Sequence, residues 1–530
     1  MKTPKYLVFI ILLLIFAAGC DLEVANINQP ERDRVLATSG DIVSLIGGSY
    51  QSLYFAIVDP DGIGPIISVN SFQHSAYPAN FGMVDYSWIP RPAVNNSPAH
   101  GFAEHFELTW YRAYRSIAAA SEGLRQIDTG EFPLAANTEI AARAFAKFSQ
   151  GVAHGYVALL YDQGFIIDET TEVTDADGFT VFYESVPAQQ LFEAATGYLD
   201  EAITIGSANA SVAISSGWTG GAIDDLGELA ELAHTYRAYF RANMPRRPAE
   251  VDQVDWHAVI DDIDAGLQKD FAPNAPSSGS DWYAWNLVYF NFPGWSQVNY
   301  FIKGMADQSG NYQTWIDLPH GSKQPTLPGD DPFLIVTPDQ RFPQGETIED
   351  QQDNRGHYML YVGSEGHARP DRGTWRWSLY RDDRYRAHWP PPPSNMDIIT
   401  VEHAQLIKAE ALYRTGDLAG AAAIINETRE GNGGLLATDA TGTNDDCVPR
   451  LPNGACGDLL EMLKWEKRLE SYQQGLSPWY FDSRRWGDHM EGTFLQLPIP
   501  GKELEVLERS MYTFGGVGGQ FAAPVGTYGF

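Results

Sequence analysis

The sequence has little cysteine, little positive charge and only one long hydrophobic run. Its three cysteines are too few for a disulfide-dense scaffold. The 36 Lys and Arg residues stand against 68 Asp and Glu residues, which gives a formal net charge of −32 at pH 7. Binding to a nucleic acid needs a basic face, so we expect no nucleic-acid partner. The N-terminal run is too short to span a membrane, which takes about 20 apolar residues, and no later stretch is long and apolar enough to do so.

The N-terminus is typical of an exported lipoprotein. Lys2 and Lys5 precede an apolar run over residues 7–18, which stops at Gly19 and Cys20. A basic start, a short hydrophobic core and small residues before a cut describe a secretory signal peptide. We therefore predict that residues 1–19 are removed and that Cys20 carries the lipid that anchors the chain to a membrane. An ordinary signal peptide that happens to end in cysteine is the alternative.

The other two cysteines, Cys447 and Cys456, stand in a stretch rich in Gly, Asn and Pro. Outside the cytoplasm such a pair favours a disulfide that closes a short loop. A metal site would need more ligands, and none with suitable spacing lies nearby in the sequence. We predict no metal and no cofactor.

Common enzyme motifs are missing. The sequence has no Gly-x-Ser-x-Gly, His-Glu-x-x-His or Walker motif. Residues 175–178 begin like a calcium loop but lack its closing Glu, so a turn is expected there. With so many carboxylates, some pair will lie at a glycosidase-like separation, and the sequence alone leaves hydrolysis open. We expect a binding protein with no catalytic residue rather than an enzyme.

Apolar residues at helical spacing indicate helices along most of the chain. The predicted helices cover residues 41–57, 102–127, 135–161, 187–205, 226–243, 256–267, 401–414 and 418–429. Gly416 suits a helix C-cap and Asp417 an N-cap in the last pair. Small residues such as Ala409 and Ala421 at the expected crossings resemble tetratricopeptide units without their strict period. The predicted fold is mostly α, a degenerate tetratricopeptide-like helical-repeat scaffold.

Residues 271–395 have a different composition. Pro, Gly, Ser and Asp interrupt this segment every few residues, and no apolar stripe persists for the length of a helix. We expect long loops and short strands packed over the helical scaffold. The predicted organisation is a signal peptide (1–19), an N-terminal part (20–270), a loop-rich ligand-binding segment (271–395) and a C-terminal part (396–530), with 20–530 as one compact unit.

Several motifs in a fixed order carry a family resemblance. They are a capping box at 458–461, Trp465-Glu466-Lys467-Arg468, Trp479-Tyr480-Phe481-Asp482, Leu497-Pro498-Ile499-Pro500 and, earlier, Cys20-Asp21-Leu22 and Trp110-Tyr111-Arg112. With the helix pair at 401–429, they make the chain resemble the SusD/RagB family of outer-membrane nutrient-binding lipoproteins. This chain departs from the family pattern at residues 472–476, where it has Tyr-Gln-Gln-Gly-Leu and the family often shows Phe-Glu-Gly followed by Arg. We expect the charged and aromatic members of the C-terminal motif to hold it onto the scaffold: Glu466, Arg468, Arg484, Arg485 and Trp486.

The resemblance implies a location and a partner. Such a protein would be lipid-anchored at the cell outer membrane, exposed on the surface, and would capture an oligosaccharide or polysaccharide for a SusC-like TonB-dependent transporter. Peptide or other nutrient cargo for the same kind of transporter remains open. A lipid-anchored scaffold without a ligand is a further alternative.

Candidate ligand-binding residues combine aromatic and planar polar side chains. Sugar rings stack on aromatic faces, and their hydroxyls bond to amide, carboxylate and guanidinium groups. Two regions outside the predicted helices hold both kinds of residue: Trp88, Arg91, Asn95 and Asn96 in an early loop, and Trp282, Trp285, Tyr289, Trp295 and Trp315 in the middle segment. We predict that these residues contribute to ligand binding. For any one of the aromatics, packing in the core is the alternative.

An arginine cluster is unusual in so acidic a chain. Its members lie within 18 residues: Arg369, Arg372, Arg376, Arg381, Arg384 and Arg386. Arginine binds anionic groups in a bidentate manner, so one hypothesis is a site for a glycan that carries uronate or sulfate. Internal pairing with Asp371, Asp382 and Asp383 is the interpretation that we favour.

Overall fold

The computed structural model describes residues 38–75, 82–172, 183–289, 297–323, 333–362, 378, 380–385 and 394–530. The predicted signal peptide and Cys20 lie outside these ranges. Within them the chain is mostly helical, with short two-stranded sheets as its only strand pairs. None of the helices in this part of the chain is long and apolar enough to cross a membrane.

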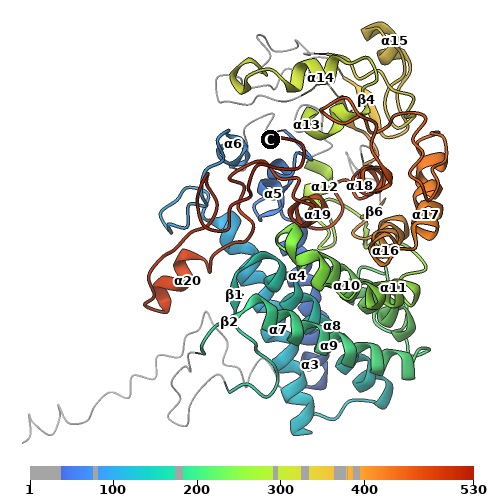
Figure 1. Cartoon of the computed structure of the whole chain (residues 1–530). Helices are drawn as coiled ribbons and strands as arrows, with labels where there is room; N and C mark the ends of the chain where they lie inside the picture. Colours follow the sequence, from blue (N-terminus) through green and yellow to red (C-terminus); the bar gives the residue numbers. More distant parts are fainter. Residues whose placement is uncertain are drawn as a thin grey trace, which may run out of the picture.

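The longer helices form a layered array in which each packs against the next (Figure 1). In chain order they are α7 (Glu104–Thr129), α8 (Ala136–Leu160), α9 (Ala188–Ala208), α10 (Leu226–Asn243), α11 (Trp256–Asp264), α16 (Val401–Thr415) and α17 (Leu418–Gly431). Gly416 takes φ +90° as the cap of α16, and the Asp417 side chain caps α17 by accepting from the Gly420 N–H. The predicted mostly α, tetratricopeptide-like fold is confirmed.

The N-terminal end of the array is built from shorter helices than predicted. They are α3 (Ser39–Gly47), α4 (Ser49–Val58), α5 (Gly64–Asn70) and α6 (Met83–Ser87). The prediction of one continuous helix over 41–57 is wrong, because α3 ends at Gly47 and α4 begins at Ser49, with Gly48 between them as the cap of both helices. The Ser49 hydroxyl then bonds to the Ile46 carbonyl at 2.6 Å, which satisfies an acceptor at the break.

The middle segment contains short helices as well as the expected loops and strands. The short helices along the chain are α12 (Trp285–Tyr289), α13 (Tyr300–Lys303), α14 (Asn311–Ile316), α15 (Ile348–Asp353) and the 3-10 turns η1 (Ser216–Trp218), η2 (Pro248–Gln253), η3 (Gly304–Ala306) and η4 (His320–Lys323). The antiparallel pairs are β1 (Gln163–Gly164) with β2 (Val186–Pro187), β3 (Asn274–Ala275) with β6 (Ser394–Asn395), and β4 (Met359–Tyr361) with β5 (Tyr380–Asp382). Helices of one or two turns are too short to show a periodic apolar stripe, so the sequence pattern missed them.

The C-terminal motif is buried and crossed by ion pairs. It forms α18 (Leu459–Glu470), α19 (Pro478–Trp486) and α20 (Gly501–Val506), and the Asp458 side chain caps α18 by accepting from the Glu461 N–H at 3.0 Å. Glu466 pairs with Arg341 at 2.6 Å, and Arg468 pairs with Asp488 at 2.6 Å. The motif therefore has the structural role that we expected of it.

Arg484 and Glu410 extend this buried polar layer to the helical array. Arg484 donates to three carbonyls, those of Leu159, Leu495 and Asn243, at 2.8, 3.0 and 2.8 Å. Glu410 on α16 accepts from the indole N–H of Trp486 at 2.8 Å. Because each of these contacts joins segments far apart in the sequence, they fix α19 against the array.

Apolar side chains gather in two large cores. The first fills the helical array around α4, α7, α8 and α10. The second lies under the middle segment and joins it to α18, α19 and the segment 528–530. The elements that this core joins, α13, α14 and the end of the chain, lie in the upper half of Figure 1. This second core carries the cavity described below.

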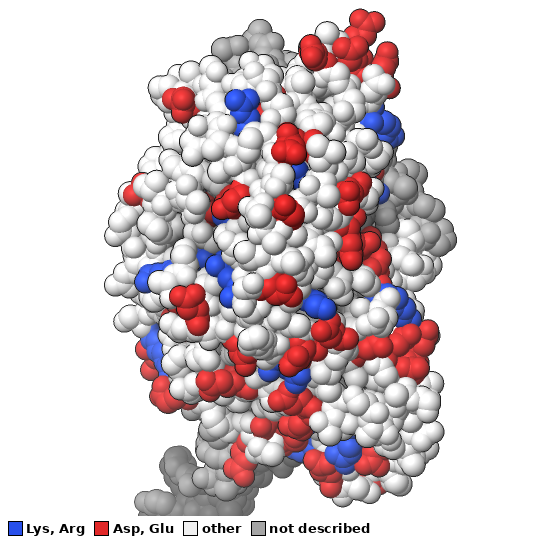
Figure 2. All heavy atoms as spheres, turned by 45° about the vertical axis from the view of Figure 1, so that its right-hand side comes forward, with Lys and Arg blue, Asp and Glu red and all other residues white. Residues whose placement is uncertain are grey.

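Acidic side chains dominate the surface shown in Figure 2. They spread over its right and lower parts, with basic side chains between them. Several of the basic residues are in ion pairs, such as Lys147 with Glu169 at 2.7 Å and Lys269 with Glu228 at 2.8 Å. The large negative charge thus favours solubility and disfavours polyanionic partners.

Candidate functional site

Only some of the predicted ligand-binding residues of the early loop lie on the surface. Arg91 is buried: it donates to the Tyr86 carbonyl at 2.5 Å, and its guanidinium lies 5.2 Å from the centre of the Phe72 ring. Burial lowers the pKa of Arg91 to about 9. Trp88 is 45% exposed and Asn95 is exposed, so these two side chains are available to a ligand.

Asn96 ties the early loop to the C-terminal segment. Its Nδ2 donates to the carbonyls of Ile499 and Tyr512 at 3.0 and 3.1 Å, and its Oδ1 accepts from the Gly501 N–H at 3.0 Å. Three of the four hydrogen bonds that an amide side chain offers are therefore used by the fold. We do not retain Asn96 or Arg91 as ligand contacts.

The tryptophans of the middle segment divide between core and surface. Trp282 is 7% exposed and packs on Tyr50 and Tyr54, with ring centres 6.4 and 4.9 Å away. Trp315 is 3% exposed and belongs to the second core. Both are core residues, which was the alternative for each aromatic.

Trp285 keeps part of its surface. It is half-buried and packs edge-on against Tyr283 with ring centres 4.7 Å apart. Tyr289 ends α12, but its side chain lies outside the described residues, as does the whole of Trp295. A ligand role for Trp285, Tyr289 and Trp295 stays a prediction.

Two of the clustered arginines fall within the described ranges, and both pair internally. Arg384 contacts Asp382 at 2.9 Å, and Arg381 contacts Asp383 at 3.5 Å. These contacts follow the interpretation that we favoured. Arg369, Arg372, Arg376 and Arg386 lie outside the described residues.

A cavity of about 410 Å³ opens beside the second core. Four stretches of the chain line it: Phe301 of α13, the end of α14 with the turn that follows it, Pro452 with Asn453, and residues 528–530. Ligand pockets for small molecules occupy roughly 300–1,000 Å³, so the cavity has room for a ligand. We take it as the candidate functional site.

The floor of this cavity is a fixed group of aromatic rings. Phe530 packs on Phe301 at 5.0 Å and on Tyr528 at 5.8 Å, measured between ring centres. Phe72 stacks on the far side of Phe301 at 4.5 Å, and Arg91 lies over Phe72. The early loop and the middle segment, which the sequence named separately, therefore meet behind this floor.

Tyr528 is held by the C-terminal motif. Its hydroxyl donates to the Glu461 carboxylate at 2.6 Å and accepts from Arg468 at 3.3 Å. The polar end of the side chain is thus anchored inside the protein, and its ring lines the cavity. An anchored ring loses little conformational entropy when a ligand stacks on it.

Polar and apolar groups share the rim. Leu318 is 40% exposed, and the adjacent Asp317 is exposed, with no hydrogen bond or ion pair from its carboxylate to any described residue. The His320 ring lies 6.4 Å from the Phe301 ring between centres. Lys323 donates to the Leu318 carbonyl and closes the turn, so the rim is shaped by its own hydrogen bond.

A larger cavity of about 530 Å³ lies between α9, α10 and η2. Its charged groups already serve the fold: Arg246 donates to the carbonyls of Ala158 and Tyr161 at 2.8 and 2.7 Å, and Arg241 pairs with Asp262. It offers one aromatic ring, that of Phe192. It therefore offers less aromatic surface than the cavity beside the second core.

No group of three or more His, Cys, Asp or Glu side chains in the described ranges is placed to hold a metal ion. The lining residues of the cavity offer aromatic surfaces and hydrogen-bonding groups. The sequence pattern missed Phe301, Tyr528, Phe530 and Asn453, because they come from three distant segments and only the fold brings them together.

Comparison with known proteins identifies the fold. No sequence-family model and no curated protein sequence matches the chain. Among solved structures, the chain is similar to a SusD homolog from Bacteroides thetaiotaomicron, with a TM-score of 0.54, 13% identity, and coverage of 91% of this chain and 98% of that one. It is also similar to a SusD-like protein from Bacteroides fragilis, with a TM-score of 0.50, 12% identity, and coverage of 86% and 88%. The chain has the SusD-like fold, as the motifs predicted.

Proposed function

We propose that this chain is a surface lipoprotein that binds an oligosaccharide or polysaccharide and delivers it to a TonB-dependent outer-membrane transporter. The observation that carries the proposal is the cavity of about 410 Å³, which combines an aromatic floor with the rim carboxylate of Asp317, for which the described part of the chain provides no partner. The SusD-like fold and the lipoprotein-type N-terminus support it. The proposed lipid anchor is Cys20, and the proposed partner is a SusC-like transporter.

The chemistry of the cavity fits a sugar. One face of a pyranose ring is lined with C–H groups, which pack on aromatic rings. Tyr528 and Phe530 line the cavity and keep some exposure, 9% and 7%, whereas Phe301 is fully buried and supports them from behind. The sugar hydroxyls need acceptors and donors, and the Asp317 carboxylate offers two acceptor oxygens that no described residue occupies. Such a combination of an apolar face and oriented polar groups is what small-molecule sites use for affinity and specificity.

Affinity electrophoresis of residues 21–530, without the lipid anchor, tests sugar binding. Starch, laminarin, xylan, inulin and polygalacturonate would be cast separately into native gels. The proposal predicts that at least one polysaccharide retards the wild-type protein. The change Asp317→Ala should weaken binding of that polysaccharide about ten- to hundredfold, because a hydrogen bond to a charged group contributes about 1.5–3 kcal/mol.

Asp353→Ala is the matched control. Asp353 is an exposed aspartate on α15 and does not line the cavity. Its replacement should leave the retardation unchanged. If both variants lose the same amount of affinity, the binding does not use this cavity and the assignment of the site is wrong.

Peptide cargo and a scaffold without a ligand make different predictions. Peptide cargo predicts that no polysaccharide retards the wild type, while a mixture of oligopeptides binds it in calorimetry. A pure scaffold predicts binding in neither assay. Incubation of the protein with each polysaccharide should release no reducing ends, and release would show an enzyme instead.

The transporter partner is tested separately. The lipidated protein, tagged at its C-terminus, would be extracted from outer membranes with a mild detergent. The proposal predicts that a TonB-dependent transporter co-purifies with it, while a Cys20→Ala variant, which has no lipid anchor, yields less of the complex. Recovery of the tagged protein alone from washed membranes would contradict the delivery role but not the sugar binding.

A further inference from the structure

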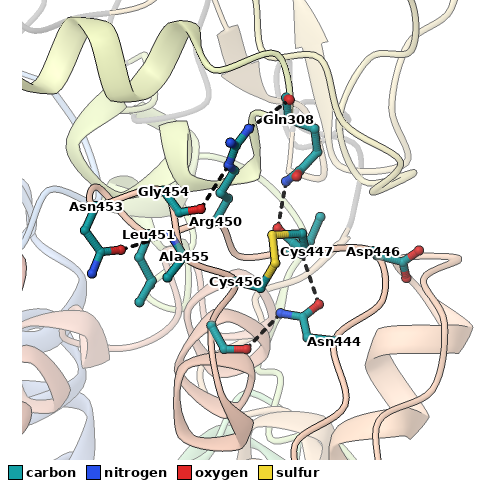
Figure 3. Close-up of a disulfide and its surroundings, with 12 residues drawn as sticks. Gln308, Asn444, Asp446, Cys447, Arg450, Leu451, Asn453, Gly454, Ala455 and Cys456 are labelled. Carbon is teal, nitrogen blue, oxygen red and sulfur yellow. Dashed lines mark hydrogen bonds between the residues drawn. A yellow bond between two sulfur atoms is a disulfide. The ribbon is translucent and has the colours of Figure 1, made fainter.

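A disulfide-closed loop forms one wall of the cavity. Cys447 and Cys456 are bonded, with their Cα atoms 4.6 Å apart, and close the loop of residues 448–455 (Figure 3). Two residues at the tip of this loop, Pro452 and Asn453, line the cavity. The loop begins in the second core, where Val448 is fully buried.

Hydrogen bonds hold the loop against the middle segment. Arg450 donates from its backbone N–H to the Met305 carbonyl at 2.7 Å and from its guanidinium to the Gln308 carbonyl at 3.1 Å. In return, the Gln308 side chain donates to the Cys447 carbonyl at 2.8 Å (Figure 3). The loop therefore has a defined position relative to the segment that carries the aromatic floor.

The loop is also bonded to α14, whose end carries the other wall. The Gln313 side chain donates to the Leu451 carbonyl at 3.1 Å. Asp317 directly follows α14 and lies on the rim. Because α14 is bonded to the loop, the distance between the two walls is set by a chain of hydrogen bonds and the disulfide.

The tip of the loop is a tight turn. The Leu451 N–H donates to the Ala455 carbonyl, and the Gly454 N–H donates to the Leu451 carbonyl, each at 2.8 Å. Gly454 takes φ +83°, a conformation that glycine adopts without strain. This geometry places Asn453 at the exposed outer end of the turn.

The amide of Asn453 is oriented by the turn. Its Oδ1 accepts from the Ala455 N–H at 3.0 Å, which fixes which side of the amide faces the loop. In Figure 3 the Nδ2 group points away from the loop backbone. Among the described residues Nδ2 has no acceptor, so two N–H donors are held ready at the cavity.

We propose that the disulfide-closed loop is a specificity-determining wall, in which Asn453 Nδ2 donates a hydrogen bond to a hydroxyl of the bound sugar. This inference rests on the proposed sugar-binding function. The donor of Asn453 complements the acceptor of Asp317, so a polyhydroxylated ligand on the aromatic floor meets a donor on one wall and an acceptor on the other. The disulfide keeps the donor in place.

The experiment compares Asn453→Ala, Asn453→Asp and a Cys447→Ser/Cys456→Ser double variant with the wild type in the five polysaccharide gels. Each of the three should weaken the strongest wild-type retardation about two- to tenfold, the range expected for one uncharged hydrogen bond. Asn453→Asp replaces the donor by an acceptor and should not restore binding. Reduction of the wild type with dithiothreitol should have the effect of the double variant.

A surface asparagine far from the cavity provides the control. Asn137 is exposed at the start of α8, and Asn137→Ala should bind like the wild type. Thermal melts of every variant separate loss of binding from loss of folding. Asn453 is exposed, so its variants remain informative even if the cysteine variant does not fold.

The outcomes distinguish this inference from the proposed function. Wild-type binding that both Asn453 variants leave unchanged overturns the inference and leaves sugar binding intact. A loss with Asp317→Ala but not with Asn453→Ala places the sugar against the opposite wall and also overturns it. No retardation of the wild type by any of the five polysaccharides overturns both.

Discussion

Glu410 should be among the most sensitive positions for stability. Its carboxylate is fully buried on α16 and contacts Arg485, Lys467 and the indole N–H of Trp486. These partners lie on α18 and α19, so this one side chain joins three helices. The change Glu410→Gln keeps the shape but removes the negative charge. Two buried cations then lose a counter-charge.

The size of the effect follows from the burial. Removing one partner of a buried ion pair costs about 3–5 kcal/mol, because the remaining charge is left without compensation away from water. We expect Glu410→Gln to lower the free energy of unfolding by about that amount. Urea titration followed by tryptophan fluorescence would measure it, since Trp486 lies in direct contact with Glu410.

Glu402→Gln is the control for this measurement. Glu402 lies on the same helix but is exposed, so its replacement should change the stability by less than about 0.5 kcal/mol. A loss of under about 1 kcal/mol for Glu410→Gln would refute the reasoning. It would mean that Asp482, which is 3.0 Å from Lys467, compensates both cations by itself.

The pH dependence gives an independent check. Burial by itself raises the pKa of Glu410, but the charges of Arg485 and Lys467 outweigh it and hold the pKa well below the ordinary value of 4.5. A carboxyl whose pKa is depressed in the folded state stabilises the protein above its unfolded pKa, and this stabilisation is lost as the pH falls through the folded pKa. The difference between wild type and Glu410→Gln should therefore be full at pH 7 and shrink below about pH 4.5.

Three further predictions concern residues that the sequence named as site candidates. Trp282→Ala should lower the free energy of unfolding by about 3–5 kcal/mol in a urea titration, because it empties a core position. Trp88→Ala should leave the stability unchanged, and equal effects of the two changes would contradict the difference in burial between the two side chains. Asn96→Ala should lower the free energy of unfolding by about 1–3 kcal/mol and increase proteolysis of the C-terminal segment, because it leaves backbone groups of that segment unpaired. An unaltered digestion pattern would argue against a role of Asn96 in holding the segment. Replacing Cys447 and Cys456 by Ser should lower the free energy of unfolding by about 2–3 kcal/mol in thermal or urea unfolding, as expected for a short loop closed by a disulfide. No change would show that the hydrogen bonds of the loop stabilise it without the disulfide.

Trp282 and Trp315, which we predicted as ligand contacts, lie in the core for a common physical reason. Trp282 and Trp315 stand in a segment whose composition indicates loops, and a tryptophan in a loop suggests a surface. The tertiary structure folds that segment over both cores, where the ring of Trp282 fills the first core, the ring of Trp315 fills the second, and both exclude water. Composition does not distinguish an aromatic residue that fills a core from one that lines a ligand site.

The sequence by itself determined the helical scaffold, because helix periodicity and capping are local properties. Residues 226–243 show this: the apolar stripe predicted the bounds of α10 as the structure has them. The order of the C-terminal motifs likewise indicated the SusD-like fold, and the spacing of Cys447 and Cys456 indicated a loop closed by a disulfide. Only the tertiary structure decided what surrounds the cavity. Phe301, Asn453 and Phe530 are more than 70 residues apart along the chain, and their proximity depends on long-range packing of the second core and on buried ion pairs that no local pattern encodes.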